Sequence, residues 1–147
     1  YGYKNLDLTN SVLTPHIGEF SKLINVELKE LNKNILFYGE EFVKEKNCYL
    51  VLKGPRTIIF TKEQEIFINS VGNEGLAKFG TGDVLTGVIA GFLSQTKSFE
   101  DSLISGVYLH SFAADLLKEE KTEFGYTSTD LLEKLPFAIK FIKNSIV

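Results

Sequence analysis

The chain has 147 residues, about the length of one domain, with 44% hydrophobic and 24% charged residues. Its net charge of −3 provides no basic surface of the kind that binds nucleic acid, and no apolar run is long enough to span a bilayer. The single cysteine, Cys48, cannot form an internal disulfide and is expected to be a buried thiol. We therefore expect a cytoplasmic enzyme or binding domain that uses neither nucleic acid nor a membrane as its partner.

Strand-like and helix-like patterns follow one another along the first half of the chain. The predicted strands cover residues 11–14, 49–52, 57–61 and 65–70, and the predicted helices cover 18–24 and 32–47. The strand 49–52 is apolar throughout, as expected when both faces of a strand are covered. The last two strands should form a hairpin at one side of the sheet.

The second half of the chain is predicted to be helical. Helices are expected over residues 84–94, 99–119 and 128–144, with a polar loop before the last and an interruption of the last at Pro136. Together the two halves indicate an α/β fold with a mainly parallel central sheet and helices on its faces. In such sheets, ligands bind beyond the carboxyl ends of the strands.

A glycine-rich loop lies between the last predicted strand and the helix 84–94. It contains Gly72, Gly75, Gly80 and Gly82, and Asp83 follows directly. A glycine loop that opens a helix directs backbone N–H groups and the positive end of the helix dipole at one point, which is suited to an anion. Asp83 would then stand where a carboxylate could take a proton from a hydroxyl beside that anion. The alternative is that the glycines only shape a turn and that Asp83 caps the helix.

Two other polar motifs follow predicted strands. In the segment 14–19, Pro15 and Gly18 favour a turn that holds His16 and Glu19 near the end of the first strand. A carboxylate beside a phosphate site commonly holds Mg²⁺, often through water, although Glu19 could equally be a residue of the helix start. The other motif follows the strand 49–52 and has two cations and a hydroxyl that suit a polyphosphate: Lys53, Gly54, Pro55, Arg56 and Thr57. All three motifs should gather at one edge of the sheet.

Taken in this order, the motifs resemble those of the ADP- or ATP-dependent NAD(P)H-hydrate dehydratases of the ribokinase-like superfamily. The resemblance rests on Leu-Thr-Pro-His-Ile-Gly-Glu-Phe at 13–20, on Leu-Lys-Gly-Pro-Arg-Thr-Ile-Ile at 52–59 and on the segment 72–95. It implies a three-layer ribokinase-like fold. It also implies a repair reaction, in which hydrated NADH or NADPH is phosphorylated on its new hydroxyl and then loses the phosphate, with ADP or ATP consumed.

The resemblance also assigns roles to individual residues. It implies that the nucleotide is bound by Lys53, Gly54, Pro55, Arg56, Thr57, Gly80, Thr81 and Gly82. His16 and Asp83 would contact the hydrated dinucleotide, with Asp83 as the catalytic base, and Glu19 occupies the acidic position that related kinases use near Mg²⁺. A homo-oligomer is expected, and an epimerase domain is often fused upstream among bacterial relatives.

The chain departs from the family pattern in two respects. Glu74 and Ile17 replace common prolines, and Lys78 and Phe79 are bulkier than the small residues usual at their positions. The family fold also has strands and helices before the first segment seen here, and the sequence has no methionine. We therefore expect residues 1–147 to be the C-terminal portion of a single ribokinase-like domain whose remaining part packs against exposed sheet surface.

Two other functions are compatible with the sequence. One is a small-molecule kinase acting on a vitamin precursor or a sugar, although such kinases usually carry Asn where this chain has His16. The other is a nucleotide-binding module without catalysis, against which the presence of both Lys53 and Asp83 argues.

Overall fold

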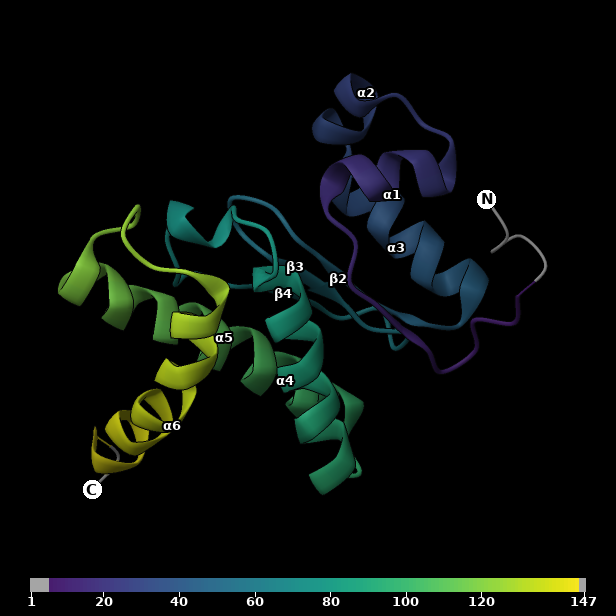
Figure 1. The fold of residues 1–147 in the computed structure, drawn as a ribbon. Coiled ribbons are helices and arrows are strands. Elements are labelled where there is room, and N and C mark those ends of the chain that lie inside the picture. Colours follow the sequence, from purple (N-terminus) through teal and green to yellow (C-terminus); the bar gives the residue numbers. More distant parts are fainter. Residues whose placement is uncertain (1–5, 146–147) are drawn as a thin grey trace. The chain divides into compact units, whose positions relative to one another are not determined.

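The computed structural model describes residues 6–145 (Figure 1). The chain divides into two compact units, Tyr1–Ile68 and Asn69–Val147. The first unit contains a four-stranded sheet in the order β1-β2-β3-β4, with β1 at Val12–Leu13, β2 at Tyr49–Leu52, β3 at Ile58–Phe60 and β4 at Ile66–Ile68. Its helices are α1 (Ile17–Ile24), α2 (Leu28–Lys33) and α3 (Ile35–Lys46).

The sheet is mixed, whereas the sequence predicts a mainly parallel one. β1 and β2 are parallel, with Val12 opposite Tyr49, but β2–β3 and β3–β4 are antiparallel. The reason is the short connection 53–57, because a parallel neighbour requires a crossover of a dozen or more residues. The α/β class, the buried strand β2 and the β3–β4 hairpin are confirmed.

The core of the first unit lies between α1, α3 and the sheet. Its buried residues include Phe20, Phe42 and Phe60, and the rings of Phe20 and Phe42 meet edge to face with their centroids 5.3 Å apart. Gly39 lets α3 approach the sheet, because a Cβ atom there would lie 2.3 Å from the Phe60 ring. Cys48 is buried as predicted, and burial raises the pKa of its thiol to about 11.

The second unit is helical over its described residues, 69–145. The short helix η2 (Glu74–Leu76) precedes α4 (Thr81–Gln95), α5 (Phe99–Lys121) and α6 (Ser128–Ser145). α5 packs against both other long helices, and a Cβ atom at Gly106 would lie 2.9 Å from the Ile89 side chain, so a glycine permits the close contact of α5 with α4. These helices are teal, green and yellow in Figure 1.

Pro136 does not interrupt α6, contrary to the sequence-based expectation. The helix is continuous from Ser128 to Ser145 although proline donates no backbone hydrogen bond. Leu131 and Ala138, on either side of it, are completely buried in the core of this unit. The packing of the apolar face therefore outweighs the missing hydrogen bond.

Candidate active site

The ends of β1 and β2 bring two of the predicted motifs together. The backbone N–H of Lys53 donates to the carbonyl of Pro15 at 2.9 Å, and His16 and Lys53 form a parallel bridge beyond the two strands. The segments 14–19 and 53–57 thus meet at the carboxyl edge of the parallel pair, as predicted. The glycine loop belongs to the second unit.

His16 and Glu19 form a reciprocal cap at the start of α1. The backbone N–H groups of Gly18 and Glu19 both donate to His16 Nδ1, at 3.1 Å each, and His16 N–H donates to Glu19 Oε2 at 2.7 Å. Because Nδ1 is an acceptor, the neutral ring carries its proton on Nε2. Both side chains are exposed, and His16 Nε2 lies 3.4 Å from Glu19 Oε1, so a ligand that reaches this edge meets the two side chains together.

Glu19 fits Mg²⁺ only in part. Its Oε2 accepts the His16 N–H, and its Oε1 lies 3.4 Å from His16 Nε2. A carboxylate has further lone pairs, and Mg²⁺ usually binds one or two carboxylates together with waters and substrate phosphates. Among the residues from 6 to 145, no cluster of three or more His, Cys, Asp or Glu could hold a metal by itself. Glu19 is therefore compatible with a water-bridged ion held mainly by phosphates.

The segment 53–57 forms the exposed turn between β2 and β3. Gly54, Pro55 and Arg56 are exposed, and Lys53 and Thr57 are half-buried beside the ends of the strands. The bond from the Lys53 N–H to Pro15 fixes the backbone of this turn independently of the lysine side chain. The turn thus presents two cationic side chains on a fixed backbone, as a polyphosphate site requires.

The glycine loop ends at Gly80, which is the N-cap of α4. Gly80 has φ of 85°, and a Cβ atom there would lie 2.7 Å from Ser128 Oγ, so both the conformation and the space call for glycine. A helix leaves its first N–H groups without intrahelical acceptors, and a glycine cap supplies no side-chain acceptor. The N–H groups of Thr81, Gly82 and Asp83 therefore form a site suited to an anion. The Asp83 side chain is exposed in the same first turn.

Thr81 takes part in this site through its backbone. Its side chain is buried, and its hydroxyl donates to the carbonyls of Leu76 and Lys78 at 2.6 and 2.8 Å. Its own carbonyl lies 2.9 Å from Nε2 of the buried His110 on α5. The threonine thus ties η2, the loop and α5 to the first turn of α4.

A hydrogen-bonded brace holds the other end of the loop, and sequence reasoning missed it. The Asp115 carboxylate accepts from Gly72 N–H and from the Asn73 amide, at 2.8 and 2.9 Å. Asn73 Oδ1 in turn accepts from Gly75 N–H at 3.0 Å and from the Tyr126 hydroxyl at 2.9 Å. Burial, followed by the Asp115 charge, raises the pKa of Tyr126 to about 12. The Gly-Asn pair at 72–73 predicts only a turn, because the partners Asp115 and Tyr126 lie more than forty positions away.

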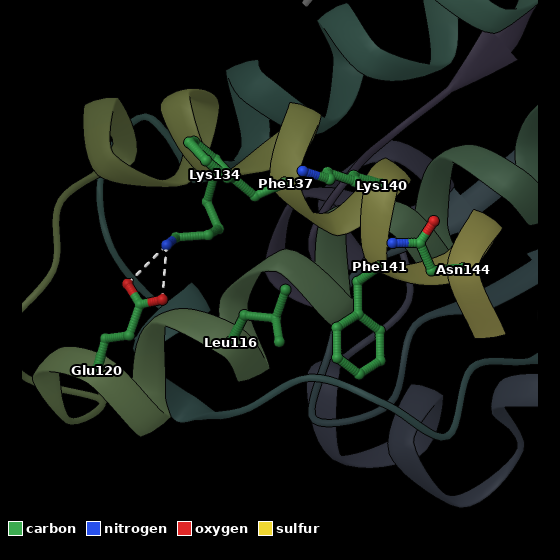
Figure 2. Close-up of a pocket in the computed structure, with 7 residues that line it drawn as sticks. All are labelled: Leu116, Glu120, Lys134, Phe137, Lys140, Phe141 and Asn144. Carbon is green, nitrogen blue, oxygen red and sulfur yellow. Dashed lines mark hydrogen bonds and ion pairs between the residues drawn. The ribbon is translucent and has the colours of Figure 1, made fainter.

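A surface pocket lies between α5 and α6 of the second unit. It has a volume of about 320 Å³ and is lined by Leu116, Glu120, Lys134, Phe137, Lys140, Phe141 and Asn144 (Figure 2). Lys134 donates to both carboxylate oxygens of Glu120, at 2.6 and 2.7 Å. None of the predicted site residues lines it, so this pocket is not the predicted site.

The chain is similar to known proteins over most of its length. A family model described as NAD(P)H-hydrate dehydratase matches residues 4–137. A bifunctional NAD(P)H-hydrate repair enzyme from Thermofilum pendens is 37% identical over 91% of this chain and 26% of its own length. The crystal structure of the ADP/ATP-dependent NAD(P)H-hydrate dehydratase from Bacillus subtilis, co-crystallized with ATP/Mg²⁺, matches with a TM-score of 0.86 and 35% identity. That match covers 90% of this chain and 48% of the Bacillus protein.

The fold is that of the ribokinase-like proteins. A ribokinase-like superfamily protein from Enterococcus faecalis matches with a TM-score of 0.77 and 36% identity, over 89% of this chain and 44% of that one. The chain belongs to the NAD(P)H-hydrate dehydratase family. It spans about a quarter of the bifunctional relative and about half of the Bacillus dehydratase. Of the helices between residues 6 and 145, none combines the length and the apolar character needed to cross a membrane.

Proposed function

We propose that the protein uses a nucleotide to dehydrate hydrated NADH or NADPH and so restores the cofactor. The observation that carries this proposal is the first turn of α4, where three backbone N–H groups without helical acceptors adjoin the exposed carboxylate of Asp83. A phosphoryl group in transfer needs donors for its equatorial oxygens and a base at the attacking hydroxyl. Family membership supports this interpretation.

The reaction assigned to the site has two parts. Asp83 takes the proton of the hydroxyl on the hydrated nicotinamide ring as the oxygen attacks the terminal phosphorus, and the bond from that phosphorus to the nucleotide breaks. The C–O bond to the phosphate then breaks, and the phosphate, a better leaving group than hydroxide, departs with that electron pair. The neighbouring ring carbon loses a proton to solvent, and its C–H electron pair forms the restored double bond. The N–H groups of Thr81 and Gly82 stabilise the charge on the transferred group, with Gly80 fixing their direction.

The other predicted residues are assigned to binding. The turn formed by Lys53, Gly54, Pro55, Arg56 and Thr57 binds the nucleotide phosphates, and the Nε2 edge of His16 contacts the hydrated dinucleotide. Mg²⁺ would neutralise phosphate charge when bound, with Glu19 holding it through water. ADP or ATP serves as phosphoryl donor; the relatives are described as ADP- or ATP-dependent.

We further propose that residues 1–147 form the C-terminal portion of a single ribokinase-like domain, since the chain spans about half of the Bacillus dehydratase. We also propose that the complete gene product is a cytoplasmic homo-oligomer. An epimerase domain could be fused upstream of the dehydratase domain, as a counterpart of the second activity of the bifunctional relatives.

The proposed function is tested by determining which substrate the complete gene product converts. It is incubated with ADP or ATP and Mg²⁺, and with either hydrated NADH or a set of vitamin precursors and sugars. Regeneration of NADH at the expense of the nucleotide is expected. A phosphorylated precursor without NADH formation would assign the protein to the small-molecule kinases instead, and nucleotide binding without any product would leave a binding module.

A further inference from the structure

Phe79 is the most exposed large apolar residue of the described chain. Its relative exposure is 102%, and it stands two residues before Thr81, the first residue of α4. A fully exposed phenylalanine leaves a large apolar ring in water, which is unfavourable, so an exposed ring at a fixed position suggests a contact with a ligand.

The backbone on both sides of Phe79 is fixed. The ammonium group of Lys78 donates to the carbonyls of Glu123 and Tyr126, at 2.8 Å each, and lies 4.3 Å from the centroid of the Tyr126 ring. On the other side, Gly80 is held in its left-handed conformation against Ser128. Phe79 is therefore held between two anchored residues and is directed away from the rest of its own unit.

The place of Phe79 relates it to the nucleotides of the proposed reaction. In a nucleotide, the planar ring is joined to the nearest phosphate through one ribose, so a phosphate at the start of α4 brings a ring close to the residues that precede the helix. An aromatic side chain gains from stacking on such a ring whatever the base. An aliphatic side chain in the same place would lack this interaction.

We propose that Phe79 is a specificity-determining contact that stacks on the planar ring of a nucleotide bound at the start of α4. Lys78 acts through Phe79 and is a positioning residue. This inference rests on the proposed function, because the ring is that of the phosphoryl donor or that of the dinucleotide. It adds a ring contact to a site otherwise built from phosphate-binding groups.

The experiment uses the complete gene product with Phe79→Ala, Phe79→Tyr and, as a matched control, Phe124→Ala. Phe124 is another phenylalanine, 84% exposed in the same unit. Calorimetric titrations with ADP and with inorganic pyrophosphate separate the ring from the phosphates, and the KM for hydrated NADH reports on the dinucleotide. For Phe79→Ala we expect about tenfold weaker binding of ADP, with pyrophosphate affinity unchanged. Phe79→Tyr should retain the wild-type affinity for ADP. Phe124→Ala should leave the affinities for ADP and for pyrophosphate unchanged.

If the ring belongs to the dinucleotide, ADP affinity stays constant and the KM for hydrated NADH rises about tenfold instead. Lys78→Ala should weaken the binding of the same ligand as Phe79→Ala does. The double variant should bind this ligand no more weakly than Phe79→Ala, as expected when Lys78 acts through Phe79. Unchanged ADP affinity and KM in Phe79→Ala would overturn the proposal. So would equal losses for ADP and pyrophosphate together with a lower melting temperature, since Phe79 would then pack against protein. A wild-type protein without ADP binding or turnover would refute the proposed function as well.

Discussion

His110 Nε2 on α5 lies 2.9 Å from the carbonyl oxygen of Thr81, and both residues are buried. This bond fixes the first turn of α4, which carries the proposed anion site, to the longest helix of the unit. His110→Ala should lower the free energy of unfolding by about 1–3 kcal/mol, because it removes a buried partner and leaves a cavity. His110→Gln should recover part of the loss, since its amide can donate from a similar position. Urea denaturation measures the unfolding free energy of both variants. An unchanged denaturation midpoint for His110→Ala would show that His110 does not fix the first turn of α4.

Gly80→Ala should both destabilise the protein and weaken nucleotide binding. Alanine is strained at φ of 85°, and its Cβ atom would lie 2.7 Å from Ser128 Oγ. We expect a loss of more than about 1 kcal/mol in unfolding free energy. The matched control is Gly87→Ala in the middle of α4, where a Cβ atom meets nothing within 4 Å and alanine should stabilise the helix by about 0.5–1 kcal/mol. Equal effects of the two substitutions would show that Gly80 is not needed for the loop.

Asp83→Asn should abolish turnover and leave nucleotide affinity within a few-fold. The exposed carboxylate stands in the first turn of α4, and loss of a general base typically costs ~10²–10⁴ in rate. Steady-state kinetics and calorimetry on the complete gene product separate the two effects. Turnover at the wild-type rate would exclude Asp83 as the base.

Lys53→Ala should weaken nucleotide binding by roughly 1.5–3 kcal/mol, the usual scale for a hydrogen bond to a charged group. The fold should persist, because the Lys53 backbone stays bonded to Pro15. Lys44→Ala, an exposed lysine on α3, removes the same charge elsewhere and should leave the affinity unchanged. If both variants bind equally well, the Lys53 side chain is a solvated charge.

Asp130 should make stability depend on acid pH. Hydrogen bonds from Lys121 and from Thr127 lower the pKa of its carboxyl from 3.8 to about 2. Because the folded-state pKa is the lower one, the stabilisation is present above about pH 4 and is lost as the pH falls toward 2. Asp130→Asn should therefore reduce the slope of unfolding free energy against pH in that window. An identical slope in the variant would show that Asp130 contributes nothing to it.

The sequence predicted most of the helices and strands. It also predicted that the segments 14–19 and 53–57 lie at the same edge of the sheet. The apolar pattern and composition located β2, α1 and α5 closely. The positions of His16 and Lys53 after strands predicted that their segments lie at one edge of the sheet, where the two residues form a bridge. The helix α2 was missed because its six residues are too few to show a periodic apolar face. α4 begins at Thr81 and not at residue 84, since the polar and glycine residues of its first turn gave no helical pattern.

Other features depend on partners that are distant in sequence. The Asp115–Asn73–Tyr126 brace joins residues more than forty positions apart, so no local pattern reveals it. Thr81 was predicted to bind the nucleotide, but that its hydroxyl is used inside the loop follows only from the tertiary structure. The mixed sheet could have been predicted, because the connection 53–57 is too short for a parallel crossover.

The most direct test of the central claim is the stoichiometry of the reaction catalysed by the complete gene product. Hydrated NADH and ADP are supplied with Mg²⁺, and NADH, AMP and inorganic phosphate are measured over time. We expect the three products to appear in equal amounts and Asp83→Asn to yield none of them. Consumption of ADP with the phosphate retained on an organic product, or formation of NADH without loss of ADP, would contradict it.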